Sequence, residues 1–238
     1  MFGFCCPAVV AAKGAPRLLI GHGSGSFGHQ AAAEGGLTTG ADARRRLDAI
    51  VRTQRSASEL HRIVVAAIAE AGARPFSLAP SSFLSAANGR VTDAFVEPVF
   101  TALDRGLLPV VYGDIVLDRV RGAVIVATEE IFLILAKEAA RRKRVFSRAV
   151  WLGETEGILD DGGLAIARLS PAAAMRTARR VHGASGVDVT GGMALRLRTA
   201  AALARADVPS LILDGRRAGA IATAIAGRAK GGTRVDAR

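Results

Sequence analysis

Residues 18–29 read Leu-Leu-Ile-Gly-His-Gly-Ser-Gly-Ser-Phe-Gly-His. The apolar residues 18–20 predict a short buried strand, and the glycines after it predict a tight loop at its carboxyl end. Glycine reaches conformations closed to other residues, so successive N–H groups of this loop can converge on an anion. The imidazoles of His22 and His29 could donate further bonds to phosphate oxygens. We therefore expect a phosphate-binding loop, with a plain glycine-rich turn as the alternative.

The rest of the chain alternates apolar runs with helical patterns. Apolar residues recur at helical spacing through residues 41–71, which predicts one long helix or two successive helices. Further strands are predicted at 75–78, 109–112, 145–152 and 210–213, and further helices at 129–142, 171–178, 191–206 and 218–226. This alternation implies crossover connections and a parallel sheet covered on both faces. We expect an α/β protein, a three-layer α/β/α sandwich with a mainly parallel central sheet, in which residues 18–238 form a single domain after an atypical segment 1–17.

The composition argues against several classes of protein. The formal charge is +11, but the basic residues are scattered, and one Trp and one Tyr offer little surface for stacking bases, so we expect no nucleic-acid partner. The two cysteines are adjacent and have no histidine at metal-ligand spacing, so neither a disulfide framework nor a metal site is predicted. No apolar stretch is long enough to span a bilayer, so we expect a cytoplasmic protein without stable membrane association.

A second candidate anion site lies at residues 186–193, which read Gly-Val-Asp-Val-Thr-Gly-Gly-Met and lead into a predicted helix. Asp188 can cap that helix, and Gly191 and Gly192 let its N-terminus approach a phosphate, where the helix dipole favours negative charge. Arg196 follows one turn later and could reach the same anion. The alternative is an ordinary N-capped helix after a loop.

Acidic residues follow two of the predicted strands. Gly113 and Asp114 follow one strand, and Glu154 and Gly157 lie in the turn after another. Ligands of open parallel sheets collect at the carboxyl ends of the strands, so these carboxylates could orient a basic group or bind magnesium through water. The alternative is that they face solvent or cap a neighbouring element.

These motifs, in this order, resemble one known family. The segments HGSGSFGH (22–29), VVYGD (110–114), ATEEIF (127–132), ETEGI (154–158), DVTGGM (188–193) and GGT (231–233) are similar to those of the isopentenyl phosphate kinases, within the amino-acid-kinase superfamily. The resemblance runs from about residue 18 to the C-terminus. It implies a kinase that uses ATP to phosphorylate a small phosphorylated substrate, most simply isopentenyl phosphate, which becomes isopentenyl diphosphate. It also implies ATP and Mg²⁺ as cofactors and a homodimer. The alternatives are a related kinase similar to fosfomycin kinases, or a catalytically impaired member that binds an anion or a nucleotide.

The resemblance also implies roles for individual residues. His29, Arg196 and Asp114 would be catalytic. The acceptor would be bound by Gly23, Ser24, Gly28, His29 and Gly113. The nucleotide would be bound by Gly25, Glu154, Gly157, Asp188, Gly191, Gly192 and Arg196. No protein metal site is expected.

The chain departs from the family pattern at several positions. Family members carry a Lys-x-Gly-Gly-Ser strand tens of residues before the histidine-bearing loop, and residues 13–15, Lys-Gly-Ala, do not match it. Arg196 stands where the family has lysine, which keeps the charge but changes its geometry. Residues 127–130 read Ala-Thr-Glu-Glu in place of Ser-Gly-Asp-Asp, and Ser24 replaces a glycine.

Overall fold

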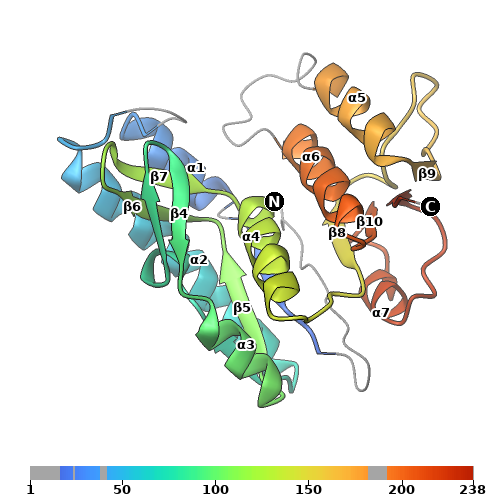
Figure 1. Cartoon of the computed structure of the whole chain (residues 1–238), viewed down its shortest axis with the longest axis horizontal. Helices are drawn as coiled ribbons and strands as arrows, with labels where there is room; N and C mark the ends of the chain where they lie inside the picture. The colour runs from blue at the N-terminus through green and yellow to red at the C-terminus, as the bar shows by residue number, and fades with distance from the viewer. Residues whose placement is uncertain (1–16, 24, 38–41, 182–191, 238) are drawn as a thin grey trace. The chain divides into compact units, whose positions relative to one another are not determined.

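The computed structural model describes residues 17–23, 25–37, 42–181 and 192–237. The chain divides into two compact units (Figure 1). Unit 1 contains Leu19–Ile134, and unit 2 contains Leu135–Arg238 together with residues 17 and 18.

Unit 1 holds two small sheets. The first has the order β1 (Ile20–His22), β5 (Leu108–Tyr112), β2 (Pro75–Ser77), and both of its pairings are parallel. The second has the order β4 (Arg90–Ala94), β3 (Leu84–Ala87), β6 (Asp114–Asp118), β7 (Gly122–Val126). Here β3 pairs with β6 in parallel, and the two outer pairings are antiparallel hairpins. The predicted strands at 75–78 and 109–112 are confirmed, and β3 was not predicted.

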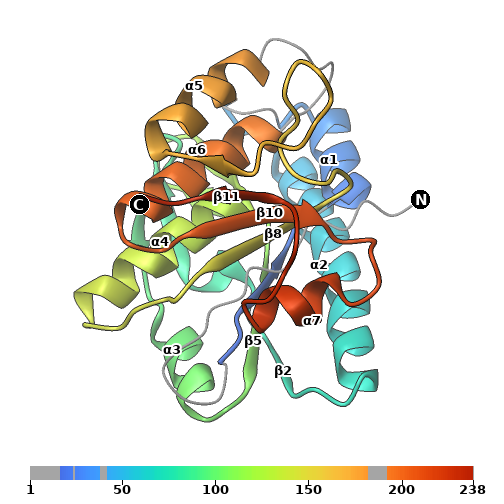
Figure 2. The ribbon, with the colours of Figure 1, turned by 90° about the vertical axis from the view of Figure 1, so that its right-hand side faces the viewer.

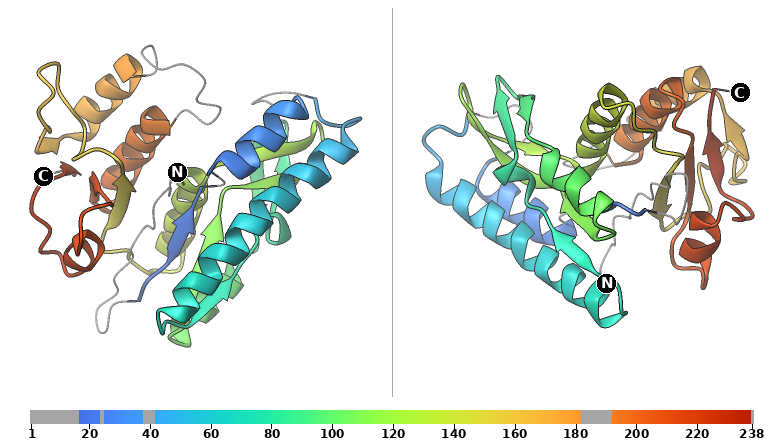
Figure 3. Two further views of the ribbon diagram at one scale, coloured as in Figure 1. Left: turned by 180° about the vertical axis from the view of Figure 1, so that it is seen from behind. Right: turned by 60° about the horizontal axis from the view of Figure 1, so that its bottom comes forward.

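The helices of unit 1 are α1 (Gly25–Glu34), α2 (Leu47–Glu70), α3 (Glu97–Asp104) and the first half of α4 (Thr128–Arg141), with a short 3-10 helix η1 (Pro80–Ser82). Helices α1 and α2 pack side by side (Figure 3). Their contact is close because residue 35, just after α1, is glycine: a Cβ there would lie 2.5 Å from Ala49 Cβ. The predicted long helix is confirmed, but it buries Ala49, Thr53, Ala57 and His61 and not its larger apolar side chains.

The prediction of a loop over residues 22–29 was wrong in its second half. The chain turns after β1, but Gly25–Glu34 is helical. Each glycine in a helix lowers helix stability by about 1 kcal/mol relative to alanine, so a glycine-rich segment taken alone is predicted to be a loop. Tertiary packing overrides that cost, because fully buried Ala32 of α1 joins the core formed with Leu37, Ala49 and Ile115.

Unit 2 is built around one sheet with the order β8 (Ala149–Gly153), β10 (Ser210–Asp214), β11 (Thr233–Val235), β9 (Arg168–Leu169). Figure 2 shows α7 (Ala220–Ile225) on one side of the sheet, and α5 (Pro171–Val181) and α6 (Gly192–Arg205) on the other. Val150, Leu152 and Leu213 pack against α7. Ser170 caps the N-terminus of α5, because its hydroxyl accepts a bond of 3.2 Å from the Ala173 N–H.

The expected fold class is confirmed. Parallel pairings outnumber antiparallel ones by five to three among the described strands. Antiparallel β11 and the two hairpins are the departures from a purely parallel arrangement. Within the described ranges, no helix has the length and apolar character needed to cross a membrane.

Candidate functional site

In unit 1, two of the predicted acceptor residues, Gly23 and Gly113, follow the carboxyl ends of two neighbouring parallel strands. His22, the last residue of β1, is in register with Tyr112, the last residue of β5. The His22 carbonyl accepts bonds from the Gly113 N–H at 2.9 Å and from the Thr128 hydroxyl at 2.7 Å. Gly113 is thereby held close to Gly23, the residue that follows β1.

Residue 21 of β1 must be small for this arrangement. A Cβ on Gly21 would lie 2.5 Å from Phe132 and 2.6 Å from the Thr128 methyl group, both on α4. The start of α4 therefore packs directly on the end of β1. Thr128, the residue that replaces glycine in the family pattern, contributes both this contact and the hydrogen bond to His22.

Helix α1 begins at Gly25, two residues after Gly23. The backbones of Gly25, Gly28 and His29 lie in the first turns of that helix. The first N–H groups of a helix have no intrahelical acceptor, and the helix dipole favours an anion there. Ser24 lies outside the described residues.

Asp114 is buried, and both of its carboxylate oxygens accept backbone N–H bonds. The Ser81 N–H donates to Oδ2 at 3.0 Å, and the N–H of Ile115 donates to Oδ1 at 2.8 Å. Burial raises the pKa of Asp114 despite these donors, and burial together with the nearby Asp114 raises the pKa of Tyr112 to about 12. The carboxylate thus anchors the loop before β3 to the start of β6.

In unit 2, the turns after β8 and β10 are joined. The Gly215 N–H donates to the Gly153 carbonyl at 2.9 Å. The Arg216 side chain donates two bonds to the Asp214 carboxylate and one to the Glu154 carbonyl, and the Arg216 backbone N–H donates a third bond to Asp214. Hydrogen bonds from Arg216 hold the pKa of Asp214 at about 2. Glu154, a predicted nucleotide residue, is therefore tied to β10 through its backbone.

Gly157 occupies a position that only glycine fits. Its φ is 138°, and a Cβ there would lie 2.6 Å from Thr233 Oγ1. The Thr233 hydroxyl accepts a bond of 2.7 Å from the Ile158 N–H. The GGT segment near the C-terminus thus packs against the ETEGI segment.

Arg196 lies on α6 and is buried, with 8% of its surface exposed. Its Nη1 is 3.3 Å from the point where a Cβ of Gly153 would lie, so the guanidinium extends to the end of β8. Gly192 begins the helix. Asp188 and Gly191 lie outside the described residues.

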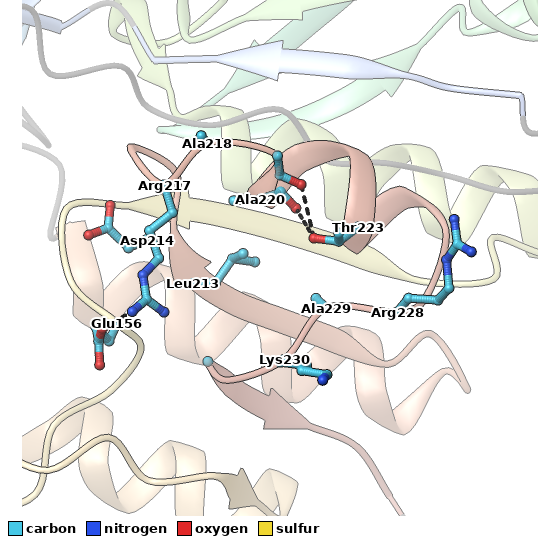
Figure 4. Close-up of a pocket in the computed structure, with 12 residues that line it drawn as sticks. Glu156, Leu213, Asp214, Arg217, Ala218, Ala220, Thr223, Arg228, Ala229 and Lys230 are labelled. Atoms are coloured by element: carbon cyan, nitrogen blue, oxygen red, sulfur yellow. Dashed lines mark hydrogen bonds and ion pairs between the residues drawn. The ribbon is translucent and has the colours of Figure 1, made fainter.

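A pocket of about 290 Å³ opens beside these turns (Figure 4). Its lining comes from the ends of β8 and β10, from α7 and from the segment before β11: Glu156, Leu213, Asp214, Arg217, Ala218, Gly219, Ala220, Thr223, Arg228, Ala229, Lys230 and Gly232. Arg217 is paired with Glu156 at 2.8 Å. Three cationic side chains line the pocket with apolar residues, a combination that suits the base and the phosphates of a nucleotide.

Most of this pocket was missed from the sequence. Asp214, Arg217, Arg228 and Lys230 were not singled out. A signal existed for the first two, because they follow a predicted strand whose carboxyl end belongs to the same edge as that of β8. Arg228 and Lys230 reach the pocket through the return of the chain to antiparallel β11, which was not predicted.

Comparison with known proteins agrees with this geometry. The sequence model of the amino acid kinase family matches residues 8–214. The chain belongs to the amino acid kinase family. It is 30% identical to the isopentenyl phosphate kinase of Methanothermobacter thermautotrophicus, over 93% of this chain and 85% of that protein. It is 27% identical to the isopentenyl phosphate kinase of Arabidopsis thaliana, over 83% of this chain and 64% of that protein.

The structure agrees with these matches. A solved isopentenyl phosphate kinase structure superimposes with a TM-score of 0.73 and 26% identity, covering 92% of this chain and 83% of the other. The structure of an isopentenyl phosphate kinase product complex from T. acidophilum superimposes with a TM-score of 0.69 and 21% identity, and it supports the fold alone. The predicted family is confirmed.

Proposed function

We propose that the protein transfers the terminal phosphoryl group of ATP to isopentenyl phosphate and forms isopentenyl diphosphate. The observation that carries the proposal is the match to an isopentenyl phosphate kinase over nearly the whole chain, at 30% identity. The histidine-bearing segment at the start of α1 and the cationic pocket of unit 2 support it.

In this proposal the acceptor binds to unit 1. Its phosphate would lie at the turn after β1, held by backbone N–H groups of Gly23, Ser24 and the first turn of α1, and by Gly113. His29 would donate to the acceptor phosphate and stabilise the charge that develops during transfer. Asp114 would act by holding the Gly113 turn in place.

The nucleotide binds to unit 2 in this proposal. The pocket lined by Arg217, Arg228 and Lys230 would take the base, ribose and part of the phosphate chain. Arg196 and the N-terminus of α6, with Gly191, Gly192 and Asp188, would hold the phosphates. Gly153 and Gly157 support this arrangement: Gly153 leaves space for the Arg196 guanidinium, and Gly157 lets the turn after β8 pack against Thr233.

The proposed Mg²⁺ would be carried chiefly by the nucleotide. Among the described residues, no group of three or more His, Cys, Asp or Glu side chains could hold a metal ion. Mg²⁺ in kinases is commonly bound by substrate phosphates, water and one or two carboxylates, so this donor set fits a metal that enters with ATP. When bound, it would neutralise charge on the phosphates, and the protein's own residues would align the acceptor with the donor.

A comparison of acceptors tests the proposal. Initial rates are measured with ATP, Mg²⁺ and either isopentenyl phosphate or fosfomycin, and kcat/KM should be highest for isopentenyl phosphate. Preference for fosfomycin would show that the acceptor is wrong and the kinase class right. Nucleotide binding without transfer to either compound would indicate a non-catalytic member of the family.

We also propose that the protein is a homodimer. Leu47 and Val51, one turn apart on α2, are both more than half exposed and present an apolar strip of the kind that marks an interface. Light scattering tests this proposal, and Val51→Glu should shift the particle to monomer mass if α2 lies in the interface. A wild-type monomer would contradict it.

A further inference from the structure

Two buried histidines in unit 1 form a direct pair. His22 Nε2 lies 2.9 Å from His61 Nδ1, and each residue is only 4% exposed. The other nitrogen of His22, Nδ1, is 2.8 Å from the Gly23 carbonyl, and the other nitrogen of His61, Nε2, is 2.8 Å from the Ser77 hydroxyl. Strand β1, helix α2 and strand β2 are thus linked through two imidazoles.

The hydrogen bonds assign one proton to each ring. A carbonyl oxygen only accepts, so His22 Nδ1 must donate to Gly23. A neutral His22 then accepts at Nε2, and His61 must donate from Nδ1. His61 Nε2 is left to accept from the Ser77 hydroxyl. Each of the three hydrogen bonds, from Ser77 to His61, from His61 to His22 and from His22 to Gly23, thus has one donor and one acceptor.

The surroundings favour neutral rings. Burial lowers the pKa of His22, and burial followed by the neighbouring His22 lowers the pKa of His61 to about 4. Tyr112 of β5 stacks on both rings, at 4.2 Å from His61 and 5.7 Å from His22 between centroids. Its hydroxyl bonds to Ser58 of α2, and Asp114 of β6 lies beyond it. Among the described residues, Tyr112 and Asp114 are the titratable groups that these contacts place next to the pair.

His22 connects this pair to the proposed acceptor site. Its ring holds the Gly23 carbonyl, and its own carbonyl holds Gly113 and Thr128. A peptide group beside glycine can reorient at little cost, because glycine occupies most of backbone conformational space. A bond to the Gly23 carbonyl therefore selects one orientation of the turn in which the acceptor phosphate would bind.

We propose that His61 is a positioning residue for the acceptor. By donating to His22 Nε2, it fixes the His22 tautomer that restrains the Gly23 carbonyl, and so keeps the acceptor turn ready to bind phosphate. This inference rests on the proposed function, since it assigns the acceptor to that turn. In this proposal His61 does not contact the phosphate and acts only through its hydrogen bond to His22.

A matched pair of variants tests this role. Asparagine and leucine have nearly the same shape, but only asparagine places a donor where His61 Nδ1 lies. His61→Leu should raise the KM for isopentenyl phosphate about tenfold or more, in line with the cost of a misplaced substrate group. The KM for ATP should stay within about twofold, and His61→Asn should restore the acceptor KM to within about threefold of wild type. Equal kinetics for the two variants, or a parallel rise in the KM for ATP, would overturn the proposal.

Two further measurements guard against a general loss of folding. Ser77→Ala removes only the hydroxyl that bonds to His61 Nε2, so it should raise the acceptor KM less than His61→Leu does. A larger effect would show that Ser77, and not His61, controls acceptor binding, and would overturn the proposal. Imidazole ¹⁵N NMR of the wild-type protein at pH 7 should show both rings neutral and protonated at Nδ1. An Nε2-protonated His22 would overturn it.

The proposed function and this inference fail in different ways. A wild-type protein that transfers no phosphate refutes the kinase proposal and leaves the tautomer measurement unchanged. In that case calorimetric binding of isopentenyl phosphate replaces KM, and His61→Leu should weaken that binding about tenfold relative to His61→Asn. Equal binding by the two variants would refute the role of His61.

Discussion

Gly157 and Thr233, although 76 residues apart, lie so close that a methyl group at residue 157 would sit 2.6 Å from the threonine hydroxyl oxygen. The contact joins the turn after β8 to β11 and brings the GGT segment beside the pocket of unit 2, which Glu156 and Gly232 help to line. Residue 157 must therefore be glycine for two reasons: a side chain would collide with Thr233, and its φ of 138° is one that other residues rarely adopt.

Gly157→Ala should therefore damage both folding and nucleotide binding. Overpacking and an unfavourable φ each cost about 1–3 kcal/mol, so we expect a loss of roughly 2–6 kcal/mol in the free energy of unfolding. Urea unfolding measures this loss, and calorimetry with ATP measures the binding. As a control, Gly163→Ala also places alanine at a positive φ, 78°, but with nothing within 4 Å of the new methyl group, so it should leave ATP affinity unchanged.

Thr233 is expected to act through its hydroxyl. Thr233→Val leaves the buried Ile158 N–H without its acceptor, at a cost of about 1–3 kcal/mol in unfolding free energy. Thr233→Ser keeps the oxygen and should lose less. Thermal unfolding of the two variants makes the comparison, and equal losses would show that the methyl group matters and the hydroxyl does not.

Asp118 is predicted to make unit 1 sensitive to acid. This buried carboxylate accepts four backbone N–H bonds from two hairpin turns, given by Asn88, Gly89, Val120 and Arg121. Burial alone would raise its pKa, but these donors outweigh burial and lower it. The folded pKa lies below the unfolded one, so the stabilisation is complete above the unfolded value and is lost as pH falls through the folded pKa.

Asp118→Asn should remove that dependence together with part of the stability. Hydrogen bonds to a charged acceptor contribute about 1.5–3 kcal/mol each, and the amide keeps only one acceptor oxygen, so we expect a loss of roughly 2–4 kcal/mol at pH 7. Urea unfolding from pH 7 to pH 3 checks both points. An unchanged slope of stability against pH would assign the acid sensitivity to other carboxylates.

Lys230 is expected to contribute to nucleotide affinity. Lys230→Ala removes one positive charge from the pocket and should raise the KM for ATP about three- to tenfold, with the acceptor KM unchanged. Lys137→Ala removes the same charge from the exposed face of α4 and serves as the control. If both variants change the KM for ATP alike, the effect comes from net charge and the pocket assignment is wrong.

Arg196 tests whether a guanidinium replaces the family lysine. Arg196→Ala should lower kcat by about a hundredfold or more, since a cation at the transferring phosphate is lost from a buried site. Arg196→Lys should recover part of that loss, because the charge returns without the planar fork. Steady-state kinetics at saturating ATP separates the two, and an unchanged kcat in Arg196→Ala would remove Arg196 from the proposed site.

The sequence predicted much of the fold where periodicity was strong. The alternation of apolar runs and helices located α2, α4, α5, α6 and the strands β5, β8 and β10 to within a few residues. Helix α1 was missed because its glycines point to a loop when taken alone, and only burial against α2 makes the segment helical. The hairpin between β3 and β4 was also missed, although Asn88 and Gly89 carry the residue pair that favours a type I′ turn.

Parts of the candidate site could be predicted from glycines at positions where two backbone segments pack closely. Gly113 and Gly157 were chosen for their place after strands, and the structure puts each against another proposed site segment. The histidine pair was not predictable, since His22 and His61 are 39 residues apart and meet only when α2 packs across the end of β1. The position of Lys230 in the pocket was not predictable either, because it requires the chain to return as antiparallel β11.

The most direct test is ³¹P NMR of the full-length protein with ATP, Mg²⁺ and isopentenyl phosphate. The predicted result is loss of the monophosphate resonance and growth of two coupled resonances from a new P–O–P linkage, in step with ADP formation. If the isopentenyl phosphate resonance persists while ATP is bound, or while ATP is hydrolysed to free phosphate, the protein is not a kinase for this acceptor.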